Sequence, residues 1–209
     1  MTERVIQTLM GWAKDLVRRV ERLEAQEGVG WPQWDDLRVD LSTAKTVGSS
    51  NLPVFTKLKD DGAGSAGVYA WAFGDGDQIF FTVQMPHGWK VGSTIYPHAH
   101  WMPLTDVSPA DNVKLTLEYS WVDIDEDMGN TTIYSREAST GENNAYRHML
   151  TEFRAAGLDG TGHTLSSVLV CRVLRQAADT DNYAGDIAIL DVDFHYELDT
   201  IGSRTASAK

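Results

Sequence analysis

The chain has 209 residues, of which 42% are hydrophobic and 23% charged, so it can bury a core in one large domain with an appendage or in two small domains. Its formal charge of −12 is spread along the chain without a basic stretch, which argues against binding to a nucleic-acid backbone. No apolar run approaches the roughly 20 residues needed to cross a bilayer, and the first residues are too charged for a secretion signal. We therefore expect no membrane or nucleic-acid partner, and a protein that stays in the cytoplasm where it is made unless it leaves inside or upon a larger particle.

Residues 2–26 have the apolar period of an amphipathic helix. Spacings of three and four alternate along it, which is typical of a heptad seam. Further apolar residues, among them Trp12 and Val17, make this face wider than a two-stranded coiled coil needs. We predict an N-terminal domain over residues 1–30 that oligomerises as a coiled-coil homotrimer through Ile6, Leu9, Ala13, Leu16, Val20 and Leu23. A single amphipathic helix that packs on its own domain is the alternative.

Residues 31–53 contain Pro32 and a polar, turn-rich stretch, and they predict an extended connector. From residue 54 to residue 209 the pattern is strand after strand, with Gly74–Asp77 as a strong turn signal. The clearest half-buried strand runs from Val113 to Trp121, where apolar and polar residues alternate. Residues 143–153 fit either a short helix or a strand. The fold class we predict is mainly β: a coiled coil followed by an antiparallel β-sandwich of jelly-roll type.

Two long strands, over residues 164–175 and 186–198, are expected to close this domain. In the second, alternation places Val192, Phe194 and Tyr196 on one face, and Asp193 and His195 on the other. The polar face is expected to be the wet side of an antiparallel sheet.

His98 and His100 share one face of a predicted strand, with side chains about 7 Å apart. The preceding Gly92 and this His-x-His pair resemble the opening of the cupin motif, whose β-barrel binds a metal through such histidines. A cupin also requires a Glu shortly after the second histidine, where this chain has Pro103, and a third histidine motif that we do not find. We predict that the pair is structural, near a subunit contact, and that the protein has no cofactor. A metal site completed by His195 is the alternative.

Two other candidate sites have simpler interpretations. The run Asp123–Asp127 holds four carboxylates but lacks the glycine and distal glutamate of an EF-hand, which favours a solvated acidic loop. Cys171 is the single cysteine, so it excludes an internal disulfide, and its apolar neighbours predict a small buried side chain.

No serine-hydrolase, phosphate-loop, zinc-protease or dinucleotide motif occurs, so we predict that the protein is not an enzyme. Five segments together resemble a family of tailed-bacteriophage virion proteins. They are 34–37, 80–89, 95–101, Cys171-Arg172 and 193–203.

The resemblance implies a virion component in which an N-terminal segment attaches to the particle and a β domain forms a trimeric knob, spike or fibre. On this basis we expect a structural protein of a phage or phage-like particle, assembled in the host cytoplasm and located in the virion. It would be a homotrimeric head fibre, decoration protein or tail-associated attachment protein. Its expected partners are itself, capsid, neck or tail proteins, and a host-surface glycan. A cupin-like metal enzyme that uses His98 and His100 is the alternative.

Overall fold

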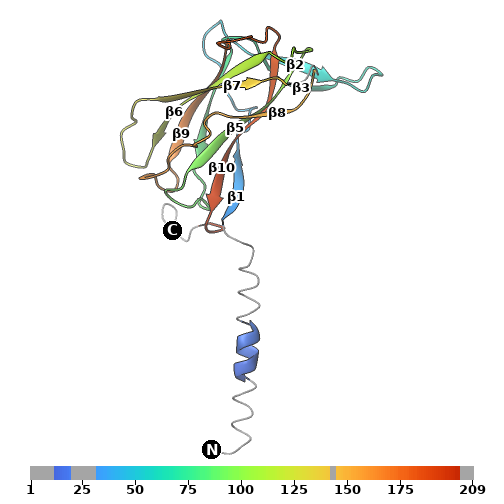
Figure 1. Cartoon of the computed structure of the whole chain (residues 1–209). Coiled ribbons are helices and arrows are strands. Elements are labelled where there is room, and N and C mark those ends of the chain that lie inside the picture. The colour runs from blue at the N-terminus through green and yellow to red at the C-terminus, as the bar shows by residue number, and fades with distance from the viewer. Residues whose placement is uncertain (1–11, 20–31, 142–144, 203–209) are drawn as a thin grey trace, which may run out of the picture. The chain divides into compact units, whose positions relative to one another are not determined.

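The computed structural model describes residues 12–19, 32–141 and 145–202. The chain divides into two compact units, Met1–Gln33 and Trp34–Lys209. In the first unit, residues 12–19 are helical, as the apolar period predicts (Figure 1). The predicted seam positions Ile6, Leu9, Val20 and Leu23 lie outside the described residues. No helix within the described ranges is both long and apolar enough to span a membrane.

The described residues of the second unit form strands and loops without a helix. The strands are β1 (Gln33–Arg38), β2 (Val54–Lys59), β3 (Val68–Phe73), β4 (Gln78–Gln84), β5 (Ile95–Pro103), β6 (Asn112–Val122), β7 (Thr132–Ser139), β8 (Met149–Glu152), β9 (Val168–Gln176) and β10 (Ile187–Leu198). Six strands make one sheet in the order β2-β3-β10-β5-β8, with β1 also paired to β10. The other sheet has the order β4-β9-β6-β7. The predicted mainly-β class with antiparallel sheets is confirmed.

The core lies between the two sheets, because each strand presents alternate residues to it. On β6, Val113, Leu115 and Leu117 are completely buried, as the alternation predicts. Phe81 of β4 and Phe194 of β10 meet edge to face across the sheets, with ring centroids 6.5 Å apart. Such contacts join the two sheets around one hydrophobic core.

Strand β10 organises the larger sheet. Its first residues pair with β3, while its length from Ile187 to Tyr196 pairs with β5 (Figure 1). The register places Asp193 opposite His98 and His195 opposite Tyr96. From Val192 to Tyr196 the residues of β10 alternate as predicted, whereas the register with β5 shifts between Ile189 and Asp191 and interrupts the alternation at Leu190. The pairing of β10 with β5 brings two widely separated segments into contact.

Three local features go beyond the sequence predictions. The Gly74–Asp77 turn leads from β3 in one sheet to β4 in the other, so it connects the layers of the sandwich. The ambiguous segment 143–153 contains a strand, β8, which pairs with β5. Residues from Trp34 onward group with the β unit, and the expected connector supplies strand β1.

Arg175 ties the Gly74–Asp77 turn to the end of β9, although its side chain is only 1% exposed. Its Nη1 donates to the carbonyl oxygens of Phe73 and Gly185 at 2.6 and 2.7 Å, and its Nη2 donates to that of Tyr183 at 2.6 Å. Its Nε forms an ion pair with Asp75 Oδ1 at 3.1 Å without hydrogen-bonding to it. Burial lowers the pKa of Arg175, but a guanidinium remains charged and needs these partners.

Candidate functional site

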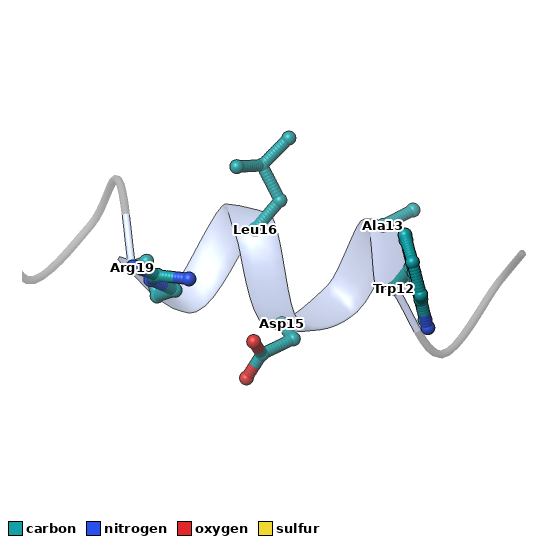
Figure 2. A pocket seen from close by; sticks show the side chains of 5 residues that line it. All are labelled: Trp12, Ala13, Asp15, Leu16 and Arg19. Carbon is teal, nitrogen blue, oxygen red and sulfur yellow. The ribbon is translucent and has the colours of Figure 1, made fainter.

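The helix at residues 12–19 carries an apolar face that is open to solvent. Trp12 is 77% exposed, Leu16 63% and Val17 55%. Figure 2 shows Ala13 and Leu16 on one side of the helix and Asp15 on the opposite side. Among the described residues, the hollow at this helix is lined by its own side chains, Asp15 and Arg19 included. Such an amphipathic helix gains stability when its apolar face is covered by a partner.

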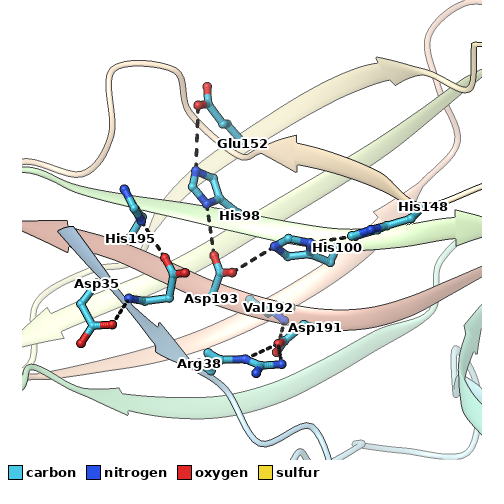
Figure 3. A network of polar contacts seen from close by, with 11 residues as sticks. Asp35, Arg38, His98, His100, His148, Glu152, Asp191, Val192, Asp193 and His195 are labelled. Carbon is cyan, nitrogen blue, oxygen red and sulfur yellow. Dashed lines mark hydrogen bonds and ion pairs between the residues drawn. The ribbon is translucent and has the colours of Figure 1, made fainter.

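A network of histidines and carboxylates lies on the outer face of the larger sheet, away from the core (Figure 3). At its centre is Asp193 of β10, whose side chain is only 7% exposed. His98 Nδ1 lies 3.1 Å from one carboxylate oxygen, and His100 Nε2 lies 3.0 Å from the other. Burial alone would raise the pKa of Asp193, but the hydrogen bonds and charges of the two histidines outweigh it and lower the pKa. The polar face of β10, which we expected to be exposed to water, is therefore buried at Asp193.

The network continues to β8 and to His148, the residue before that strand. His148 Nε2 lies 2.8 Å from His100 Nδ1, and Glu152 Oε1 lies 3.9 Å from His98 Nε2. Because ionised Asp193 only accepts hydrogen bonds, the nitrogens of His98 and His100 that face it carry protons. When the rings of His100 and His148 are both neutral, His100 Nδ1 accepts a hydrogen bond from His148 Nε2.

This arrangement differs from a metal centre, in which several deprotonated nitrogens converge on one point. His98 Nδ1 and His100 Nε2 both face the carboxylate of Asp193. Among the described residues, no group of three or more His, Cys, Asp or Glu side chains is arranged to hold a metal ion. The ring of the third metal candidate, His195, lies with its centroid 5.9 Å from that of His98, but its Nδ1 contacts Asp36.

His195 and the neighbouring acids attach β1 to the sheet. His195 Nδ1 lies 2.6 Å from Asp36 Oδ1, and its ring stacks on Trp34 with centroids 5.0 Å apart and planes 4° from parallel. Arg38 donates to Asp191 Oδ2 from its Nε at 2.7 Å and also from its Nη2. These bonds connect the strand at the start of the β unit to the centre of its larger sheet.

An open hollow of about 500 Å³ lies next to Trp34 on this outer face. Trp34 and Tyr96 contact each other there edge to face, with ring centroids 5.8 Å apart. His195 covers one face of the indole but does not line the hollow. The remaining lining is mainly polar and includes Thr94, Asp159, Thr161 and Lys90, whose Nζ pairs with Glu197 Oε1 at 2.7 Å. An aromatic edge among hydroxyls and charged groups can contact a polyhydroxylated ligand through both stacking and hydrogen bonds.

The two other sequence candidates have structural roles. Asp123 accepts hydrogen bonds from Thr164 and contacts His163 Nδ1 at 2.6 Å. Burial would raise the pKa of Asp123, but these hydrogen bonds outweigh it and lower the pKa. The first acid of the loop is thus part of the fold, whereas Asp125, Glu126 and Asp127 are exposed. Cys171 is buried, as predicted, and burial raises the pKa of its thiol.

Sequence reasoning missed two members of the network, His148 and Glu152. They come from the segment that fitted either a helix or a strand. The pairing of β8 with β5, which places Glu152 opposite His98, has no signal in the local pattern.

No protein-family model matches this chain. No curated protein matches it either.

Among solved structures, the chain is similar to the CBM22-1–GH10 modules of the endo-1,4-β-D-xylanase 10B of Clostridium thermocellum, complexed with xylohexaose. The identity is 12% and the TM-score 0.36, over 83% of this chain and 27% of that chain. TmCBM61 in complex with β-1,4-galactotriose is 13% identical with a TM-score of 0.27, over 83% and 93% of the two chains. The family 11 carbohydrate-binding module of the Clostridium thermocellum cellulase Lic26A-Cel5E is 12% identical with a TM-score of 0.28, over 85% and 94%.

Proposed function

We propose that this protein is a homotrimeric structural component of a tailed bacteriophage or a phage-like particle: a head fibre, a decoration protein or a tail-associated attachment protein. Its N-terminal helices form a coiled coil, and its two sheets form a jelly-roll-type sandwich. Neighbouring capsid, neck or tail proteins hold it on the particle. The observation that carries this proposal is the exposed apolar face of the helix at residues 12–19, which continues a heptad seam in the sequence.

The histidine network supports a structural role more than a catalytic one. His98 and His100 are both bonded to Asp193, and His195 is bonded to Asp36. Their ring nitrogens join strands β1, β5 and β10. The rings therefore act as polar crosslinks within the sheet.

The self-association part is tested by light scattering on the purified full-length chain at micromolar concentrations. We expect the mass of three chains, and of a smaller species after deletion of residues 1–28. A monomeric full-length chain would refute the homotrimer. The location on a particle is tested by electron microscopy of the parent phage labelled with an antibody against the β unit. We expect label on the head, neck or tail. Intact particles without label would contradict the assignment.

We also propose that the β unit contacts a host-surface glycan through the hollow beside Trp34 and Tyr96. The support is the exposed aromatic edge next to threonine hydroxyls, the carboxylate of Asp159 and the Lys90–Glu197 ion pair. Binding of the full-length protein to host cells should fall in Trp34→Ala and be unchanged in Val170→Ala, an exposed residue of β9. Equal binding by both variants would exclude this hollow.

A further inference from the structure

Large apolar side chains are exposed together on the β2–β3 hairpin. Phe55 is 58% exposed and Tyr69 45% on one face of the hairpin, and we call these two residues the hairpin patch. Val54 and Val68, which are 64% and 63% exposed, lie on the opposite face. Val47 and Leu52, which precede β2, are exposed as well. Figure 1 shows the hairpin projecting at one side of the β unit. Single exposed apolar residues are common on protein surfaces, but a cluster of this kind marks an interaction site.

The aromatic part of the patch is a preformed surface. The ring of Phe55 stacks on Tyr69 with centroids 5.6 Å apart and meets Trp71 edge to face at 5.4 Å. Tyr69, Trp71 and Phe73 alternate along β3 and so share one face of the sheet. Phe73 is fully buried in the core. The patch thus extends the core-facing side of the sheet outward, to where Phe55 and Tyr69 are uncovered.

The edge of β2 itself is protected against pairing with another strand. It is the terminal strand of its sheet, it carries Lys57 and Lys59, and its register with β3 is irregular between these two residues. Lysines and bulges on an edge strand oppose the addition of a further strand. A partner of this hairpin is therefore expected to meet its side chains and not its backbone.

The charge of the region indicates which partner fits. Residues 47–69 contain two lysines, Lys57 and Lys59, and two aspartates, Asp60 and Asp61, so the region has no net charge, whereas the whole chain carries −12. Copies of so acidic a chain repel one another over most of their surface. A neutral, apolar region is where two copies approach at the least electrostatic cost.

We propose that the hairpin patch contacts a second copy of this chain in the assembled oligomer. This inference rests on the proposed self-association, because helices joined at the seam hold the β units at high effective concentration. At that effective concentration, even a small apolar contact between hairpin patches is stable enough to form.

The first test compares two sets of variants of the full-length protein. Phe55→Thr combined with Tyr69→Thr removes the aromatic surface but keeps residues that favour strands. Ile133→Thr combined with Val170→Thr is the matched control, since both residues are exposed on the other sheet. We expect the patch variant to raise the dissociation constant of the oligomer by about 10- to 100-fold in sedimentation equilibrium, with little change in the control. Equal dissociation constants for both would overturn the proposal.

The second test detects the contact directly. Benzoylphenylalanine replaces Tyr69 in one variant, Ile133 in a second and Leu16 in a third, and each is irradiated as the purified full-length protein. We expect inter-chain products from positions 69 and 16 and none from position 133. Products from position 16 alone would leave the helical assembly intact and refute the hairpin contact. A protein that is monomeric and yields no products at any position would refute the proposed self-association itself.

Discussion

Leu16→Ala is the substitution that best tests the helical seam. Alanine keeps the helix propensity high, so the change removes apolar contact without breaking the helix. Full burial of a leucine side chain stabilises by about 1.5–3 kcal/mol. Because Leu16 is 63% exposed in the single chain, covering it in the seam contributes about 1–2 kcal/mol per chain. Over three chains the loss is about 3–6 kcal/mol, or roughly two to four orders of magnitude in the association constant.

The assay is sedimentation equilibrium over a range of concentrations, with far-ultraviolet circular dichroism to confirm that helix content is kept. Arg18→Ala is the matched control, because Arg18 lies two residues from Leu16 and off the seam. We expect it to change the association free energy by less than about 0.5 kcal/mol. Leu16→Asp should be more disruptive than Leu16→Ala, since it places an unpaired carboxylate in the seam. If Leu16→Ala and Arg18→Ala shift association equally, the heptad assignment is wrong.

Three further predictions concern the β unit. Arg175→Met should lower the free energy of unfolding in urea by about 3–5 kcal/mol, because it leaves three carbonyl oxygens without their donor. The same change at the exposed Arg136 should lower it by less than about 0.5 kcal/mol. Similar losses in the two variants would contradict the assigned role of Arg175. Since the folded pKa of Asp193 is lowered, its contribution is complete above the unfolded value of about 3.9 and is lost as the pH falls through the folded pKa. The stability difference between wild type and Asp193→Asn should therefore shrink below about pH 4, and a difference independent of pH between 2 and 7 would count against the network. Elemental analysis of untagged protein should find far less than one metal ion per chain; about one equivalent of zinc, iron, nickel or manganese that is lost in His98→Ala would favour the cupin-like alternative.

Local sequence patterns determined much of the secondary structure. The alternation on β6 and β10 predicted which side chains enter the core, because successive residues of a strand point to opposite faces whatever their partner strand is. The apolar period around Leu16 predicted the helix, because residues three and four apart lie on the same side of a helix. The burial of Cys171 followed from its apolar neighbours on β9.

Tertiary structure alone decided which strands meet and what their polar side chains do. Asp193 and His98 are 95 residues apart in the chain, and only the β10–β5 register places one opposite the other. Arg175 looks like an ordinary charged residue at the end of a strand, yet its guanidinium is held by the carbonyl oxygen of Phe73, 102 residues away, and by those of Tyr183 and Gly185 in the loop that follows. The sequence pattern likewise did not predict that Phe55 and Tyr69 are exposed. A local pattern records which face a side chain is on, but whether another sheet covers that face depends on contacts between segments far apart in the sequence.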